Sequence, residues 1–224
     1  MSEQDTLTTQ CFFNIREMIL SGQLLPGEKL KGDYLRQKLK TGLSPIREAL
    51  SRLVTTRLVK FEEKKGFTIV IFSENEVRDI VETYGKIECM ALKNAMENGD
   101  DKWEGRIISA LYGLSKVETK NKVAYEEWAP KNTDFHNSLV SACDSSCLLY
   151  MHSDLQQMSE WFTRLSYKFA DSKSIRTNHR EHKIIAEAVI ARKLRTASNY
   201  LYEHITGGLT NLVIQLKKND LIRG

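Results

Sequence analysis

The feature that most constrains the fold is a helical periodicity that runs through the last two thirds of the chain. From Ser73 to the end, apolar residues recur every three or four positions, and no alternating strand pattern interrupts them. This pattern predicts helices over 74–97, 101–119, 122–142, 146–169, 173–192 and 195–217, with Pro130 disturbing the third. About 150 residues of such sequence suffice for an all-α antiparallel bundle with a real core.

The first third of the chain has a different pattern. Three helices are expected, over 5–22, 32–39 and 44–56, with an extended arm at 24–30. Two short β-type runs follow, 58–61 and 67–71, around the polar turn EEKKG, which is a hairpin signal. Three helices and a hairpin predict a winged helix-turn-helix. The chain is therefore expected to be mainly α, with a winged helix-turn-helix domain over 1–72 and an all-helical domain over 73–224.

The stretch TGLSPIREALSRLV, residues 41–54, predicts the helix that contacts DNA. Ser44 is expected to cap it, with Pro45 at the first helical position. Its apolar residues share one face, which leaves a polar and basic face free. In a helix-turn-helix the second helix enters the major groove. The expected DNA-contacting residues are those of this face and of the hairpin tip: Ser44, Arg47, Arg52, Lys64, Lys65 and Gly66. The alternative is a set of ordinary solvated charges.

The charge distribution points to the same region. Residues 1–72 hold 12 Lys and Arg against 8 Asp and Glu, a net charge of +4, whereas residues 73–224 hold 21 of each. The whole excess of positive charge therefore lies in the first third, where a nucleic-acid contact is expected. An excess this small also arises by chance.

The compartment is expected to be the cytoplasm. The sequence has no apolar run near the ~20 residues of a membrane span, and its first ten residues lack the pattern of a signal peptide. The cysteines have no spacing typical of a redox pair or a zinc knuckle, so we expect them to be structural.

Histidines in the helical region suggest a metal site. Asn132 and His136 lie four residues apart, on one helical face. His182 and His204 each lie eleven residues from a turn expected near Lys193, so two antiparallel helices would bring them to the same height. Imidazoles converging from three helices are typical of a metal centre. The alternative is that these histidines are hydrogen-bonded core or surface residues.

Three segments resemble, in order and spacing, the N-terminal domain of GntR-family transcription regulators: PGEKL, SPIREALSRLV and RLVKFEEKKGFTIV. The resemblance covers about residues 12–72 and implies binding of double-stranded operator DNA. Ser44, Arg47 and Gly66 match the DNA-contacting positions of the family. Leu43 departs from it, because the family commonly has an arginine there.

The helical region resembles the FCD effector-binding domain of the FadR branch of that family, through NTDFH, EHKIIAEAVI and the final EHI. The resemblance implies a divalent transition metal, zinc or nickel, held by Asn132, His136, His182 and His204. Asn132 stands where the family has aspartate, and an amide oxygen is a weaker ligand than a carboxylate. Three neutral histidines leave the charge of the ion uncompensated, which favours an anionic effector.

Segments 101–104 and 114–118 are most similar to the carbon-starvation-induced, glutarate-responsive repressors. That resemblance implies a small dicarboxylate effector. Many members have an arginine where this chain has Tyr84, so Tyr84, Lys86 and Arg164 are the expected effector-binding residues.

Together these features predict a ligand-responsive repressor that binds an inverted-repeat operator as a homodimer and has no enzymatic activity. A second hypothesis is a metal-dependent hydrolase or isomerase fused to a DNA-binding arm. It lacks a clear general base, because Glu181 adjoins His182 in the sequence and points to another face. A third is an architectural DNA-binding protein without a ligand.

Overall fold

The structure is a computed structural model, and it describes residues 3–120, 123–169 and 178–223. The chain forms two compact units, which are described separately. The first unit contains residues 1–74 and 216–224, and the second contains residues 75–215.

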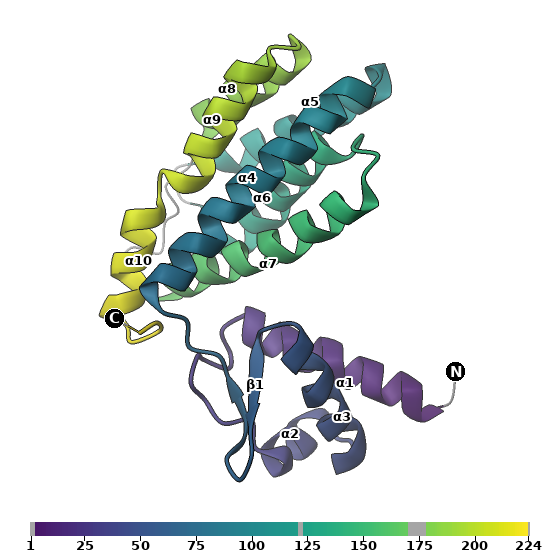
Figure 1. Cartoon of the computed structure of the whole chain (residues 1–224), viewed down its shortest axis with the longest axis vertical. Helices are drawn as coiled ribbons and strands as arrows, with labels where there is room; N and C mark the ends of the chain where they lie inside the picture. The colour runs from purple at the N-terminus through teal and green to yellow at the C-terminus, as the bar shows by residue number, and fades with distance from the viewer. Residues whose placement is uncertain (1–2, 121–122, 170–177, 224) are drawn as a thin grey trace. The chain divides into compact units, whose positions relative to one another are not determined.

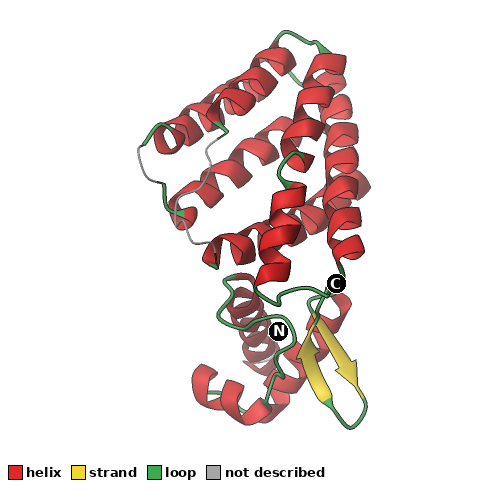
Figure 2. Cartoon of the chain, turned by 90° about the vertical axis from the view of Figure 1, so that its left-hand side faces the viewer, coloured by secondary structure: helices red, strands yellow, loops and turns green. Residues whose placement is uncertain are grey.

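The first unit is a winged helix-turn-helix. Its elements are α1 (Glu3–Leu20), α2 (Gly32–Leu39), α3 (Leu43–Thr55), β1 (Val59–Glu62) and β2 (Gly66–Ile69). The two strands pair antiparallel, with Val59 opposite Ile69 and Glu62 opposite Gly66. They are the yellow arrows of Figure 2. The predicted hairpin is therefore present, and an isolated bridge from Lys29 to Thr68 ties the predicted arm to it.

The apolar periodicity of α3 determines how it packs. Its buried residues, Pro45, Ile46, Ala49, Leu50 and Leu53, form one face, and α3 packs against α1 and α2 through it. The helix starts two residues earlier than expected, with Gly42 as its N-cap instead of Ser44. Pro45 is tolerated there because the first four N–H groups of a helix have no intrahelical acceptor.

The second unit is a helical bundle (Figure 1). Its helices are α4 (Glu74–Asn98), α5 (Asp101–Glu118), α6 (Tyr125–Val140), α7 (Ser146–Lys168), α8 (His179–Ile190) and α9 (Leu194–Thr206), and α10 (Leu209–Lys218) begins in it. Helix α5 packs against α6 and α8, and α8 packs against α9. The prediction of a single helix over 195–217 is wrong, because Gly207 and Gly208 divide this segment into α9 and α10. Residues 173–177 of another predicted helix lie outside the described residues.

The bundle core contains Trp103 and Phe135, both fully buried. Trp103 Nε1 donates to the carbonyl of Ser138 at 3.0 Å, which satisfies the one polar atom of a buried indole. Arg192, in the turn between α8 and α9, stacks over the Trp103 ring and donates to the carbonyls of Met96 and Gly99. This arginine joins the turn after α8 to the turn after α4.

The C-terminal segment belongs to the first unit. Arg223 pairs with Ser73 in a parallel bridge: its N–H donates to the carbonyl of Phe72 at 2.8 Å, and its carbonyl accepts from Glu74 at 3.1 Å. Leu221 and Ile222 are buried. Residues far apart in the sequence therefore meet at the start of α4.

Of the helices that the structure describes, none combines the length and the hydropathy of a membrane span. The four cysteines are free thiols, of which Cys11 and Cys143 are buried.

Candidate functional sites

The start of α3 and the hairpin form a basic surface in the first unit. Ser44 and Arg47 are exposed in the first turns of α3. A groove of about 440 Å³ brings Arg47 together with Lys65 and Gly66 of the hairpin. Lys29 and Lys31 also line this groove, although they were not among the expected DNA-contacting residues. The sequence feature that could have indicated them is the pair of lysines in PGEKLK, directly before α2.

The turn between β1 and β2 contains two residues with a left-handed backbone conformation. Lys64 and Gly66 both have positive φ, 67° and 81°. Glycine adopts this region without strain, and a Cβ atom at Gly66 would meet nothing within 4 Å, so the backbone of the turn is open to a ligand. Lys64 is exposed, whereas the Lys65 ammonium lies 2.8 Å from the Glu62 carboxylate.

Arg52 differs from Arg47 in its surroundings. Its guanidinium lies 4.8 Å from the centre of the Phe12 ring, and Nη1 donates to Thr9 at 3.4 Å. Arg52 therefore holds α3 against α1. Leu43 stands where the resembled family commonly has an arginine. It is exposed and packs beside Gly32.

Three histidines meet inside the second unit. His136 of α6, His182 of α8 and His204 of α9 each offer one ring nitrogen, and these atoms lie within 4.8 Å of one another. His136 and His182 are buried. The Nε2 atoms of His182 and His204 are only 3.1 Å apart. We call His136, His182 and His204 the histidine cluster.

Each histidine of the cluster is held by a different glutamate. His136 Nδ1 lies 2.6 Å from Glu88, His182 Nδ1 lies 3.1 Å from Glu118, and His204 Nδ1 lies 2.8 Å from Glu181. Carboxylates in this position fix the orientation and tautomer of metal-binding histidines and raise their basicity. No local pattern in the sequence had indicated Glu88, Glu118 or Glu181 as site residues. Glu181 does point away from His182, and it reaches His204 instead.

The ring nitrogens of His182 and His204 face each other. Burial raises the pKa of Glu118, but the hydrogen bonds to this carboxylate and the nearby His182 together outweigh burial and lower that pKa. The Nδ1 atoms of His182 and His204 lie against Glu118 and Glu181, and their Nε2 atoms lie 3.1 Å apart. Burial lowers the pKa of His182 to about 4, and burial also lowers the pKa of His204. Both rings are therefore neutral, which is the form of imidazole that binds a metal ion.

His136 has a different electrostatic environment. Burial lowers its pKa, but the Glu88 carboxylate outweighs burial and raises it. Glu88 also lies 3.6 Å from the buried His152, so one carboxylate is shared by two histidines. His152 is not part of the histidine cluster.

Asn132 lies beside the cluster, one helical turn before His136. Its Oδ1 atom is buried and has no hydrogen-bond partner. An unpaired buried oxygen is costly, and a metal ion would satisfy it. The donor set of three imidazoles and one amide oxygen thus fits a divalent transition metal.

A cavity of about 160 Å³ adjoins the cluster. His136, His204 and Asn132 line it together with Tyr84. Lys86 is exposed on α4, and Arg164 has its guanidinium 5.5 Å from the Tyr125 ring. Neither Lys86 nor Arg164 is among the described residues that line this cavity, so of the three predicted effector-binding residues the structure brings only Tyr84 to it.

Comparison with known proteins gives matches to both units. The profile of the FCD domain matches residues 79–207, and that of the gntR family of bacterial regulatory proteins matches residues 7–69. The HTH-type transcriptional repressor GlaR of Escherichia coli is 31% identical over 85% of this chain and 89% of its own. The uncharacterized HTH-type transcriptional regulator BphR of Paraburkholderia xenovorans is 29% identical over 92% of this chain and 84% of its own.

Among solved structures, E. coli McbR/YncC has a TM-score of 0.77 at 21% identity, over 96% of this chain and 99% of its own, which shows the same fold. The predicted fold class is confirmed: mainly α, with a winged helix-turn-helix and a helical FCD bundle. Such a chain is a regulator rather than an enzyme. The protein belongs to the gntR family of bacterial transcription regulators and, within it, to the FadR subfamily, whose members carry an FCD domain.

Proposed function

We propose that this DNA-binding regulator is a metal-containing repressor that responds to a small carboxylate. The observation that carries the proposal is the convergence of ring nitrogens from His136, His182 and His204, which lie within 4.8 Å of one another inside the second unit. Imidazoles that converge from three helices in this way are typical of a metal centre.

The metal would be held by the histidine cluster and Asn132, with zinc or nickel as the candidates. When bound, the ion supplies a Lewis-acidic charge to which a carboxylate can bind. The glutamates beside the cluster keep the three rings oriented. A carboxylate effector in the adjoining cavity would be a further ligand of the ion.

The DNA ligand would be a double-stranded operator with two half-sites. Ser44 and Arg47 are exposed on α3, and Lys29, Lys31, Lys65 and Gly66 surround the same groove. Arginine makes bidentate contacts to guanine, and lysines neutralise phosphates. An inverted repeat requires a two-fold dimer of the protein.

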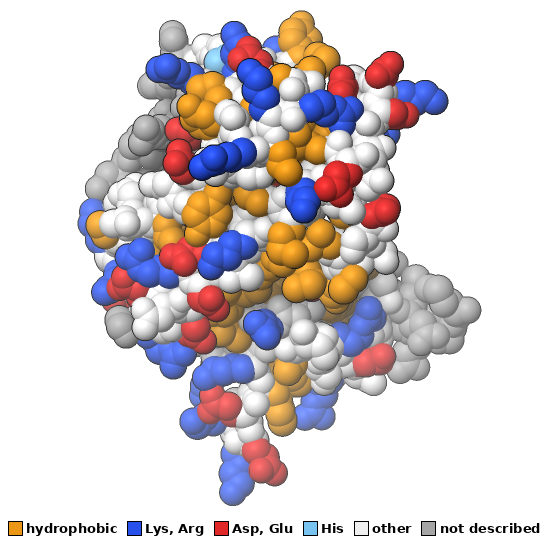
Figure 3. Space-filling model, turned by 45° about the horizontal axis from the view of Figure 1, so that its top comes forward, with side chains coloured by type: hydrophobic (Ala, Val, Ile, Leu, Met, Phe, Trp, Pro, Cys, Tyr) orange, Lys and Arg blue, Asp and Glu red, His pale blue; other side chains and the backbone are white. Residues whose placement is uncertain are grey.

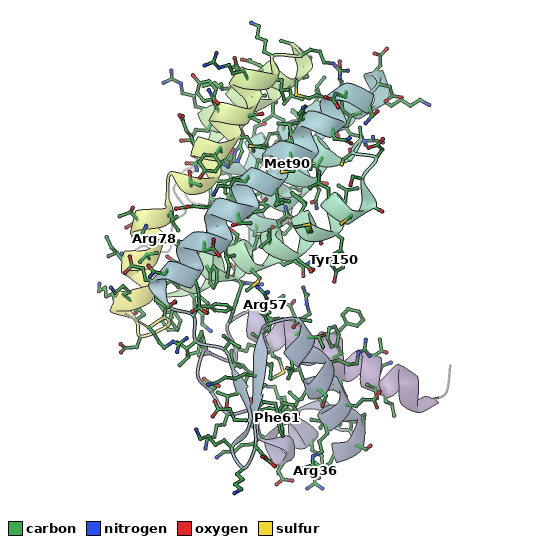
Figure 4. The ribbon with its side chains drawn as sticks, in the orientation of Figure 1. Arg36, Arg57, Phe61, Arg78, Met90 and Tyr150 are labelled. Carbon is green, nitrogen blue, oxygen red and sulfur yellow. The ribbon has the colours of Figure 1, made fainter. Side chains whose placement is uncertain are left out.

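The surface of the second unit has apolar side chains suited to such a dimer. Met90 of α4 is 57% exposed and Tyr150 of α7 is 70% exposed, and Figure 4 labels both. Figure 3 shows apolar side chains in orange between charged ones on one face. Met90 and Tyr150 are therefore candidates for the dimer contact, because an interface would bury both side chains.

Repression is proposed because GlaR is named a repressor and because of the resemblance to glutarate-responsive repressors. In that case the effector binds more tightly to the form that does not bind DNA, and its binding releases the operator. An effector that promotes operator binding would instead have to bind more tightly to the DNA-binding form.

The experiment is a selection of double-stranded DNA from a random library with zinc-loaded protein. We expect an inverted repeat to be enriched, and its affinity to fall when a small carboxylate effector binds. Arg47→Ala should enrich the repeat far less than the wild type does. Failure of the wild-type protein to enrich any sequence would contradict the proposed operator binding.

A further inference from the structure

The cavity beside the histidine cluster has a second polar region, formed by residues of α6 and α7. Thr133 and Glu160 line it, with Ser159 and Thr163 close by in the sequence of α7. Among the lining residues that the structure describes, Glu160 is the one carboxylate, and none is a lysine or an arginine. The charge of this region is therefore set by Glu160, which is negative when ionised.

Glu160 has more capacity to accept hydrogen bonds than its neighbours fill. Thr133 Oγ1 lies 2.6 Å from Glu160 Oε1, but it also lies 2.9 Å from the carbonyl of Ala129, and a hydroxyl has one proton to donate. An ionised carboxylate has about four lone-pair sites. The hydroxyl of Tyr125 donates to the backbone carbonyl of Glu160 instead of to its side chain. Burial raises the pKa of Glu160, as expected for a carboxylate with few donors.

The two regions of the cavity select for different groups on a ligand. A metal ion at the cluster would attract a carboxylate, whereas Glu160 repels one and accepts from an O–H or N–H group. The cavity volume, about 160 Å³, is that of about five water molecules, so both groups have to belong to one compact molecule.

We propose that the effector is a carboxylic acid that also carries a hydroxyl or amino group, and that Glu160 and Thr133 bind this second group. This inference rests on the proposed metal-dependent effector site. It narrows the effector from any small carboxylate, including an unsubstituted dicarboxylate, to one with a hydrogen-bond donor. A site built to hydrogen-bond such a group discriminates strongly against the analogue that lacks it, because its polar atoms are then left unpaired.

The test uses full-length, zinc-loaded protein and two matched series of probes. In each series only the substituent next to one carboxylate changes, from hydrogen to hydroxyl to amine: succinate, malate and aspartate, and glutarate, 2-hydroxyglutarate and glutamate. Binding is measured by isothermal titration calorimetry, and zinc content is measured in the same samples.

We expect a substituted member of one series to bind at least tenfold more tightly than its unsubstituted parent. The comparison of hydroxyl with amine identifies which donor Glu160 accepts. Glu160→Gln should reduce the preference for the substituted acid over its parent at least tenfold. The reduction should be largest for the amine, because its ammonium group loses the negative charge of Glu160. Glu126→Gln, an exposed glutamate of α6, is the control and should keep the preference.

The outcomes separate the inference from the proposed function. Zinc-loaded wild-type protein that binds succinate or glutarate as tightly as the substituted acids would overturn the inference and leave the metal site standing. Binding of none of the six acids would overturn the inference as well. Protein that holds no zinc would instead contradict the proposed function.

Discussion

Residue 132 is where a single side chain most directly sets the strength of the proposed metal site. An amide oxygen binds a divalent ion less strongly than a carboxylate, and Asn132 Oδ1 lies buried without a partner. We predict that Asn132→Asp binds zinc at least tenfold more tightly than the wild type, because it adds a negative charge to a set of neutral ligands. Competition with a chelator measures the change.

The control is Asn137→Asp, which makes the same replacement at an exposed position of the same helix. It should leave the affinity for zinc unchanged. Equal affinities for wild type and Asn132→Asp would show that residue 132 is not a ligand.

The sequence was informative about the histidines and not about their partners. The spacing of Asn132 and His136 on one helix, and the symmetry of His182 and His204 about a turn, are local patterns, and they predicted the cluster. Glu88 and Glu118 lie 48 and 64 residues from the histidines that they contact. Such pairs depend on how helices pack, which no local pattern contains.

Among the secondary-structure elements, α3 is the one on which DNA recognition depends. We predict that Arg47→Ala weakens specific operator binding by at least tenfold, since a good arginine–guanine contact contributes about 1–3 kcal/mol. Fluorescence anisotropy with the selected operator measures this. Arg106→Ala, which removes an exposed arginine of α5 instead, should bind like the wild type. Wild-type affinity in Arg47→Ala would contradict the role of α3.

Helix boundaries show a second limit of the sequence. A single helix was expected over 195–217, because the apolar periodicity continues through Gly207 and Gly208. The structure divides it there, since two successive glycines cost helix stability that the periodic pattern does not record. The start of α3 was also displaced by two residues, because Gly42 rather than Ser44 is the cap.

The C-terminal segment is expected to stabilise the first unit. Ending the chain after Asn219 removes the buried side chains of Leu221 and Ile222 and the two backbone hydrogen bonds of Arg223. We predict faster amide hydrogen exchange in β1, β2 and residues 70–74, by about a hundredfold or more, because burying each aliphatic side chain contributes about 1.5–3 kcal/mol.

The three tryptophans provide the internal control for that truncation. Trp103, Trp128 and Trp161 all lie in the second unit, so their fluorescence should not change. Unchanged exchange in β1 and β2 would show that the segment contributes nothing to the first unit.

For the molecule as a whole, the sequence already separated the two functions. The excess positive charge lies in residues 1–72, and four of its lysines and arginines line the groove beside α3. The histidine cluster and its cavity lie in the second unit. Charge thus marks the part that binds DNA, and buried polar groups mark the part proposed to bind the effector.

The central claim is that the second unit holds a metal ion, and elemental analysis of untagged protein purified without chelator tests it most directly. We predict about one transition-metal ion per chain for the wild type and for Arg180→Ala, which removes an exposed side chain of α8. His182→Ala should hold far less. Absence of metal from the wild type, even after dialysis against zinc and nickel, would contradict the account.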